Sequence, residues 1–315
     1  MFSKIFFHLT YHSLYIIGEI ATLILHSKEG VFNMYVNPYQ NLNNAVWKKA
    51  NFHTHSGTGP RTCGKHSPED VTYLYREYKY DFLCISNHNL FRSYRNYSDE
   101  QLTLIDGVEY TTNRIHMLTV GIQENLISLP VQEAIDRTNE LGGFAVFCHP
   151  NWPTKAAVSP EMILEHKGYL GIEVLNAVCF RLAGSGRATD IWDSLLSAGK
   201  LITGFASDDF HEMADGGRCF NLIACEEKTY ESMKQSILEN AICSSSGVYP
   251  IHHYLEDNTL HVKAALPINT YLDNYVYTFI GPNGKVLSRQ IGAEASYTLN
   301  DEDYVRVEVY AEGSC

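Results

Sequence analysis

Four short motifs place imidazole or carboxylate groups where apolar, strand-like segments of the chain end. They contain His53 and His55, then Asn87 and His88, then His149 before Pro150, and finally Asp208, Asp209 and His211. The carboxyl ends of strands can hold ligands rigidly while the adjoining loops admit a substrate. Because imidazole and carboxylate groups together bind catalytic divalent metals, the motifs predict a hydrolytic metal cluster.

The spacing within the first and last motifs supports a shared ligand role. Residues i and i+2 of a strand face the same side, so His53 and His55 can close on one cation while Thr54 points away. Asp209 and His211 repeat this spacing, and we therefore favour Asp209 as the ligand. Either pair alone is weak evidence, since isolated histidines usually bind no metal.

Three more polar residues lie in or near strand-like segments. Glu109 follows a turn and could bridge two cations through its two oxygens, and His116 lies seven residues later. Glu173 lies in an apolar run, where a carboxylate needs a cation, an arginine or several hydrogen-bond donors.

Strand-like and helix-like segments alternate from about residue 50 to residue 240, as in βα units. Ser67 before Pro68 predicts a helix start, as does Ser159 before Pro160, and Gly199 predicts a helix end. The expected strands cover residues 80–86, 144–148, 170–175 and 201–206, and expected helices cover 131–141 and 189–198. Functional residues at successive strand ends favour a barrel over an open doubly wound sheet, and no glycine-rich nucleotide loop is present.

The segments at the two ends of the chain have a different character. Residues 260–266, 275–280 and 304–310 are rich in β-branched and aromatic residues, which predicts a small antiparallel β appendage spanning 248–315. Residues 1–45 are interpreted as a partly disordered N-terminal extension in preference to an export signal, for which no cleavage site of small residues follows. Met1 and Met34 are both candidates for the functional start. The apolar run at 14–25 is too short to span a bilayer.

The composition is that of a globular protein with an ample core. The 315 residues are 45% hydrophobic and 19% charged, and the net charge of −12 disfavours binding to duplex nucleic acid or an anionic membrane. A small phosphorylated partner stays compatible, because bound cations would invert the local field. Eight scattered cysteines without a Cys-x-x-Cys pair are typical of free thiols, so a cytoplasmic location is expected. The oligomeric state stays open.

The ordered set of motifs resembles the PHP (polymerase and histidinol phosphatase) family of metal-dependent hydrolases, over residues 50 to about 247. The set comprises His53-x-His55, Asn87-His88, Glu109, His116, His149-Pro150, Glu173 and Asp209-x-His211. The remaining chain is similar to a subgroup with a small C-terminal β domain. The resemblance implies a distorted (β/α)7 TIM-like barrel at residues 46–247, with up to three metals at the carboxyl ends of its strands.

The resemblance also implies a division of the ligands. One cation would be held by His53, His55, Glu109 and Asp209, a second by Glu109, His116 and His149, and a third partly by His88 and His211. Glu173 receives no ligand role. Two departures concern the third cation: Thr62-Cys63-Gly64 stands where the family usually has Ser-Asp-Gly, and Ser86-Asn87-His88 stands where Thr-Asp-His is usual. Two or three cations are therefore expected, of zinc, manganese or iron.

The expected activity is hydrolysis of a small phosphorylated molecule or nucleotide by a hydroxide bridging two cations. Asp209 belongs to the expected catalytic set, and His88 or His211 would protonate the leaving group. Arg181, Arg187 and Lys155 follow site strands and are candidates for phosphate contact, although ordinary solvated charge explains them equally well. The alternatives are hydrolysis of a carboxylic ester, amide or carbamate at the same centre, and a noncatalytic regulatory domain.

Overall fold

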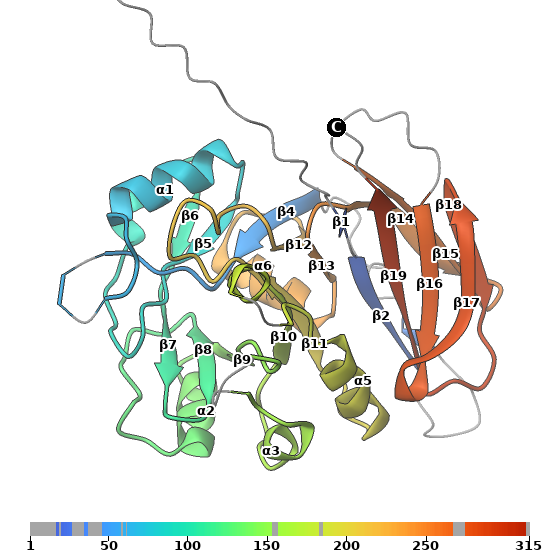
Figure 1. The fold of residues 1–315 in the computed structure, drawn as a ribbon, viewed down its shortest axis with the longest axis horizontal. Coiled ribbons are helices and arrows are strands. Elements are labelled where there is room, and N and C mark those ends of the chain that lie inside the picture. Colours follow the sequence, from blue (N-terminus) through green and yellow to red (C-terminus); the bar gives the residue numbers. More distant parts are fainter. Residues whose placement is uncertain are drawn as a thin grey trace, which may run out of the picture.

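The chain forms an α/β part joined to a part made of antiparallel strands (Figure 1). The computed structural model describes residues 46–57, 59–60, 62–152, 157–182, 185–266 and 275–311, and the backbone of residues 17–18, 20–26, 35–36 and 312. Among these residues, no helix has the length and apolar character needed to cross a bilayer.

The described helices of the α/β part are α1 (Pro68–Glu77), α2 (Val131–Glu140), α3 (Pro160–Leu164), α4 (Ala177–Arg181), α5 (Thr189–Ser197) and α6 (Tyr230–Leu238). Among them, α1, α3, α4 and α6 begin at a residue whose side chain caps the first turn, whereas α2 and α5 do not. The Ser67 hydroxyl accepts a hydrogen bond from the Asp70 amide, and the Ser159 hydroxyl accepts one from the Met162 amide. Both predicted helix starts are therefore confirmed, because each serine satisfies an amide that the first turn leaves unpaired.

The strands form three sheets. The largest runs in the order β17 (Lys285–Gly292), β16 (Tyr275–Gly281), β19 (Tyr304–Glu312), β2 (Ile20–His26), β13 (Ile242–Ser245), β12 (Phe220–Cys225), β4 (Val46–Asn51), β5 (Phe82–Cys84) and β6 (Thr103–Ile105). In addition, β1 (Ile17–Gly18) pairs with β19 and β3 (Tyr35–Val36) pairs with β2. The second sheet has the order β11 (Thr203–Ser207), β10 (Gly171–Asn176), β9 (Phe144–Phe147), β8 (His116–Val120) and β7 (Gly107–Thr111). The third contains β14 (Tyr249–Glu256), β15 (Thr259–Ala265) and β18 (Glu294–Thr298).

The expected closed barrel is wrong for the part of the chain that the structure describes, where the α/β strands belong to two separate sheets. The strands are also not all parallel, since β8 pairs antiparallel with both β7 and β9, and β12 pairs antiparallel with β4. Between β11 and β12 the side chain of Asn221 makes hydrogen bonds of the kind that backbone groups make between paired strands. The Asn221 amide donates to the Ala206 carbonyl at 2.8 Å and accepts from the Ala206 N–H at 2.9 Å.

The two sheets nevertheless approach each other where the metal-binding motifs lie. Isolated parallel bridges join Thr54 to Phe210 and His88 to Glu109. Below these bridges, aromatic side chains fill the space between the sheets: Phe52 packs edge-on against Phe144, with ring centroids 5.7 Å apart, and also contacts Phe205. The motifs therefore lie at one end of a close-packed apolar core, which fixes their positions.

The antiparallel strands after residue 248 agree with the expected β appendage, but only β14, β15 and β18 form a sheet of their own, whereas β16, β17 and β19 belong to the large sheet. Strand β2, from the predicted N-terminal extension, pairs with β13 of the α/β part on one side and with β19 on the other. Residue 34 lies outside the described residues, and β2 precedes it, so a chain starting there would lack β2. The proposed domain limits of 1–45, 46–247 and 248–315 remain an interpretation.

Candidate metal centre

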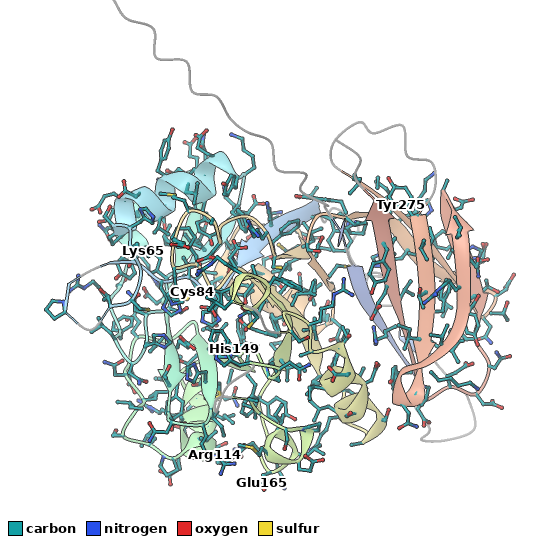
Figure 2. All side chains as sticks on the ribbon, viewed as in Figure 1. Lys65, Cys84, Arg114, His149, Glu165 and Tyr275 are labelled. Carbon is teal, nitrogen blue, oxygen red and sulfur yellow. The ribbon has the colours of Figure 1, made fainter. Side chains whose placement is uncertain are left out.

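The structure brings the predicted ligands together from six strand ends. His53 and His55 follow β4, His88 follows β5, Glu109 lies in β7, His116 begins β8, His149 follows β9, and Asp209 and His211 follow β11. Figure 2 shows His149 toward the centre of the α/β part, far from Tyr275 in the antiparallel strands. Residues separated by up to 158 positions thus share one site, because the carboxyl ends of β4, β5, β9 and β11, the start of the antiparallel strand β8 and the middle of β7 meet at one place.

The first group contains two imidazoles and two carboxylates, all buried. His53 Nε2 lies 3.2 Å from Asp209 Oδ1 and 3.4 Å from Glu109 Oε2. His55 Nε2 lies at the same two distances from the same two oxygens. Four donor atoms therefore surround one small volume, as the ligands of a single cation would.

The second group shares Glu109 with the first. Glu109 Oε1 lies 2.8 Å from His116 Nδ1 and 3.6 Å from His149 Nε2. Since the other oxygen of Glu109 faces His53 and His55, this carboxylate lies between the two groups. A carboxylate placed in this way can bridge two cations.

The third group has a different composition. His55, His88, His211 and Cys63 each offer one donor atom, and these atoms lie within 4.8 Å of one another. His88 and His211 are partly exposed, with 32% and 24% of their side chains accessible, whereas His53, His55 and Glu109 are fully buried. The third group therefore lies at the solvent side of the cluster.

Several buried nitrogen atoms of the cluster have no hydrogen-bond partner among the described residues. They are His53 Nε2, both ring nitrogens of His55, and His149 Nδ1. A buried polar atom without a partner costs about 1–3 kcal/mol. A bound cation would satisfy ring nitrogens that face the carboxylates of Glu109 and Asp209, so the residues present fit a divalent metal.

Glu173 has a supporting position rather than a place among the donor groups. Its carboxylate accepts hydrogen bonds from the ring Nδ1 of His53 at 2.7 Å and from the backbone amide of His149 at 2.8 Å. The Ser207 hydroxyl and the Asn176 amide donate two more, at 2.5 and 2.9 Å. A carboxylate only accepts, so Nδ1 of His53 carries the proton and Nε2 is left free toward the cluster.

The two aspartates after β11 have separate roles, and Asp209 is the one that faces the histidines. Asp208 accepts hydrogen bonds from the backbone amides of Gly217, Arg218 and Cys219 and from the phenols of Tyr75 and Tyr80. It therefore holds the following loop against α1. This placement agrees with our preference for Asp209 as the ligand, although its ligand role itself stays a prediction.

The electrostatics of the cluster favour ionised carboxylates. Burial opposes a charge on Glu109, but His53 and His88 hold the pKa of its carboxyl well below the usual range. Burial likewise opposes the charge on Asp209, and His53, His55 and His211 more than compensate, so its pKa is also lowered. Burial raises the pKa of the Cys63 thiol, whereas the neighbouring imidazoles of His211, His55 and His88 outweigh it and bring the pKa to about 4. The cluster thus presents anionic donors, which attract cations.

Two cluster residues have a strained backbone. His149 has φ of +28° and Asp209 has φ of +49°, both in the left-handed region that residues other than glycine rarely adopt. Such strain concentrates at functional sites, where the surrounding structure holds it in place. Both residues lie two positions beyond the end of a strand, where the change in backbone direction allows their side chains to face the cluster.

Two of the three candidate phosphate-binding residues make contacts with other side chains of the protein. Arg181 pairs with Asp215 at 2.5 Å and with Glu212 at 3.2 Å. Arg187 donates a hydrogen bond to the Tyr310 hydroxyl at 2.7 Å. Lys155 lies outside the described residues. A role in phosphate binding stays a prediction for all three, and each arginine would have to exchange a protein partner for phosphate.

The sequence reasoning missed the residues that support the donors. Asn176 donates to both Glu173 and Asp209, the latter at 3.2 Å, and Ser207 donates to Glu173. A signal was present, since Asn176 and Ser207 each end a strand-like run at the level of the motifs. Cys63 appeared in the sequence only as a departure from the family pattern, yet the structure places it beside three histidines.

Comparisons with known proteins give one informative result. No family model matches the chain, and no curated protein has a significantly similar sequence. A solved structure from Bacteroides vulgatus, a two-domain protein containing a predicted PHP-like metal-dependent phosphoesterase, has a similar fold. The TM-score is 0.51 at 14% sequence identity, and the match covers 85% of this chain and 88% of the other. At this identity the match shows a shared fold.

Proposed function

We propose that this protein is a metal-dependent phosphoesterase of the PHP type that acts on a small phosphorylated molecule. The observation that carries the proposal is the buried convergence of His53, His55, Glu109 and Asp209, with ring nitrogens that lack a hydrogen-bond partner among the described residues and that a cation would satisfy. The fold shared with the Bacteroides vulgatus protein supports the same reaction class.

The chain's own residues would divide the work as follows. His53, His55 and Asp209 would hold one cation and His116 and His149 a second, with Glu109 between them. Bound there, divalent cations would supply Lewis-acid stabilisation to the oxygens of a phosphoryl group. The apolar core below the cluster excludes water from one side, so substrate approaches from the side of His88 and His211.

The partly exposed histidines are the groups best placed to meet a leaving group. His211 Nδ1 lies 2.7 Å from the backbone carbonyl of Asp209, which can only accept, so Nδ1 donates and Nε2 faces away from the backbone. His88 is oriented in the same way by Thr111, at 2.8 Å. These fixed rings can hold or transfer a proton at Nε2.

The test pairs metal content with activity. We expect elemental analysis of the purified chain to find at least two divalent cations, and a screen of phosphorylated small molecules to find hydrolysis that a chelator abolishes. His55→Ala should lose both metal and most of the activity, whereas His252→Ala, on an exposed position of β14, should keep both. Equal activity in the wild type and His55→Ala would contradict the proposal.

A second candidate is hydrolysis of a carboxylic ester, amide or carbamate at the same centre. The observation that favours it is the engagement of Arg181 by Asp215 and Glu212, which leaves that guanidinium committed to protein carboxylates. The screen therefore includes uncharged esters and amides. Turnover of these compounds without turnover of any phosphoester would select the second candidate, and bound metal without any turnover would indicate a regulatory domain.

A further inference from the structure

Cys63 lies next to three histidines at the solvent side of the cluster. The His55 ring lies between the rings of His88 and His211, with centroids 4.6 and 4.3 Å away. The donor atoms of the four residues lie within 4.8 Å of one another. Ligand bonds of about 2.0–2.3 Å put the ligands of one tetrahedral cation within about 4 Å of each other, so small side-chain movements suffice.

The ring nitrogens of this group are prepared for a ligand independently of Cys63. His211 donates through Nδ1 to a backbone carbonyl, and His88 Nδ1 lies 2.6 Å from Glu109 Oε2 and 2.8 Å from Thr111 Oγ1. Both rings therefore keep the Nε2 lone pair available. His55 is fully buried, and neither of its ring nitrogens has a hydrogen-bond partner among the described residues.

The backbone holds Cys63 at this position from two sides. The Lys65 amide donates to the His211 carbonyl at 2.9 Å, and the Gly57 amide donates to the His66 carbonyl at 2.6 Å. Gly64 lies so close to the first motif that an added Cβ would be 2.6 Å from the Ser56 Cα. The segment after Cys63 is therefore pressed against the first and last motifs, and only glycine permits this approach.

We propose that Cys63, His88 and His211 form a third cation site beside His55 of the first group, in which Cys63 supplies a thiolate ligand, and that this site selects zinc over manganese. Thiolate and imidazole donors suit zinc, whereas manganese prefers carboxylate, carbonyl and water oxygens. The inference rests on the proposed metal centre and adds a chemically distinct site to its oxygen-rich pair. A cation held there would take the Nε2 lone pairs of His88 and His211, so these two rings would transfer a proton only while the third site is empty.

The first test uses cobalt as a spectroscopic probe of the full-length chain. Cobalt(II) bound to a thiolate gives a near-ultraviolet charge-transfer absorption that nitrogen and oxygen ligands do not give. We expect this absorption in the wild type and its loss in Cys63→Ser, together with the loss of one bound cation. Cys63→Asp should keep the cation but lose the absorption. Cys225→Ala is the matched control, because Cys225 is a buried cysteine of β12 that belongs to none of the donor groups.

The second test needs no variant. Cys63 is exposed, whereas Cys84, Cys148, Cys179, Cys219, Cys225 and Cys243 are buried. Peptide mapping after brief alkylation should find Cys63 modified in the chelator-treated chain and protected by zinc, but not by manganese. Absorption that persists in Cys63→Ser, or alkylation of Cys63 that zinc does not slow, would overturn the inference.

The outcomes separate this inference from the proposed function. If zinc fails to protect Cys63 while two other cations bind and phosphoester hydrolysis continues, the third site is wrong and the function stands. If cobalt and zinc bind at Cys63 but no substrate is hydrolysed, the site stands and the function is wrong.

Discussion

Glu173 decides which nitrogen of His53 faces the cluster. The carboxylate receives the His53 Nδ1 proton, and Ser207 and Asn176 hold it in place from the other side. Partners of this kind keep a metal-binding imidazole in the correct tautomer and raise its basicity. A buried carboxylate with four donors is thus explained without making it a ligand.

We therefore expect Glu173→Gln to weaken metal binding by about 10–100-fold. The NH2 group of glutamine would face N–H and O–H donors whose hydrogen bonds the carboxylate now accepts. Competition with a chelator measures this, and circular dichroism checks that the fold is kept. Ser207→Ala, which removes one of the four donors, should have a smaller effect. Unchanged metal affinity in Glu173→Gln would show that the carboxylate does not position His53.

At the scale of the element, the end of β11 places two adjacent aspartates in different surroundings, one facing the proposed metal ligands and one holding a loop. Asp209 faces His53 and His55, whereas Asp208 accepts the amides of residues 217–219. The turn to positive φ at Asp209 produces this separation, because it directs neighbouring side chains to different sides.

The two isosteric variants should behave in opposite ways. Asp208→Asn is expected to keep the metal and to lower the free energy of unfolding by about 1–3 kcal/mol. The reason is that the NH2 group of asparagine would face the buried amide and phenol donors that now donate to the carboxylate. Asp209→Asn should lose metal with little destabilisation of the chelator-treated protein. Denaturant unfolding and elemental analysis of both variants provide the check. Loss of metal in Asp208→Asn with a normal unfolding midpoint would contradict this assignment.

The elements themselves were largely predictable from local sequence signals. The predicted helix start at Ser67 and the strand at 144–148 correspond to α1 and β9, because capping groups and apolar runs act over a few residues. The break between the two α/β sheets at β11 and β12 was not predictable. It depends on Asn221, whose side chain replaces the ladder between β11 and β12, and no local pattern marks an asparagine for that role.

In the candidate site, too, the features set by local sequence were predictable and those set by distant contacts were not. The spacing of His53 and His55 and of Asp209 and His211 pointed to the donors, because strand alternation is a local rule. The supporting contacts of Glu173 and the approach of Cys63 join distant parts of the chain, and only the fold brings them together.

At the scale of the whole molecule, a buried ion pair joins the two parts of the protein. Arg306 in β19 donates through Nε and Nη2 to the two carboxylate oxygens of Asp193 in α5, both at 2.7 Å. Tyr304 also donates to Asp193, at 3.0 Å. The pair is bidentate and almost fully buried, so it fixes how α5 lies against the large sheet.

Removing one partner should therefore cost more than removing both. Arg306→Leu leaves Asp193 buried without its cation, which is expected to destabilise the protein by about 3–5 kcal/mol. The double variant Asp193→Leu/Arg306→Leu should recover part of this loss. Guanidinium unfolding of the wild type, both single variants and the double variant measures the coupling. Strictly additive effects would show that the pair does not act as a unit.

The pairing of β2 with β19 can form only late in the synthesis of the chain. Residues 21–25 of β2 pair with residues 304–308 of β19, so the ribosome adds about 280 residues between the two partners. At about 5–20 residues per second, synthesis of β19 follows that of β2 by roughly a quarter of a minute to a minute. During that time one edge of β2 offers unpaired backbone groups to any other chain. The nascent chain is therefore most exposed to mispairing of β2 before β19 has been synthesised.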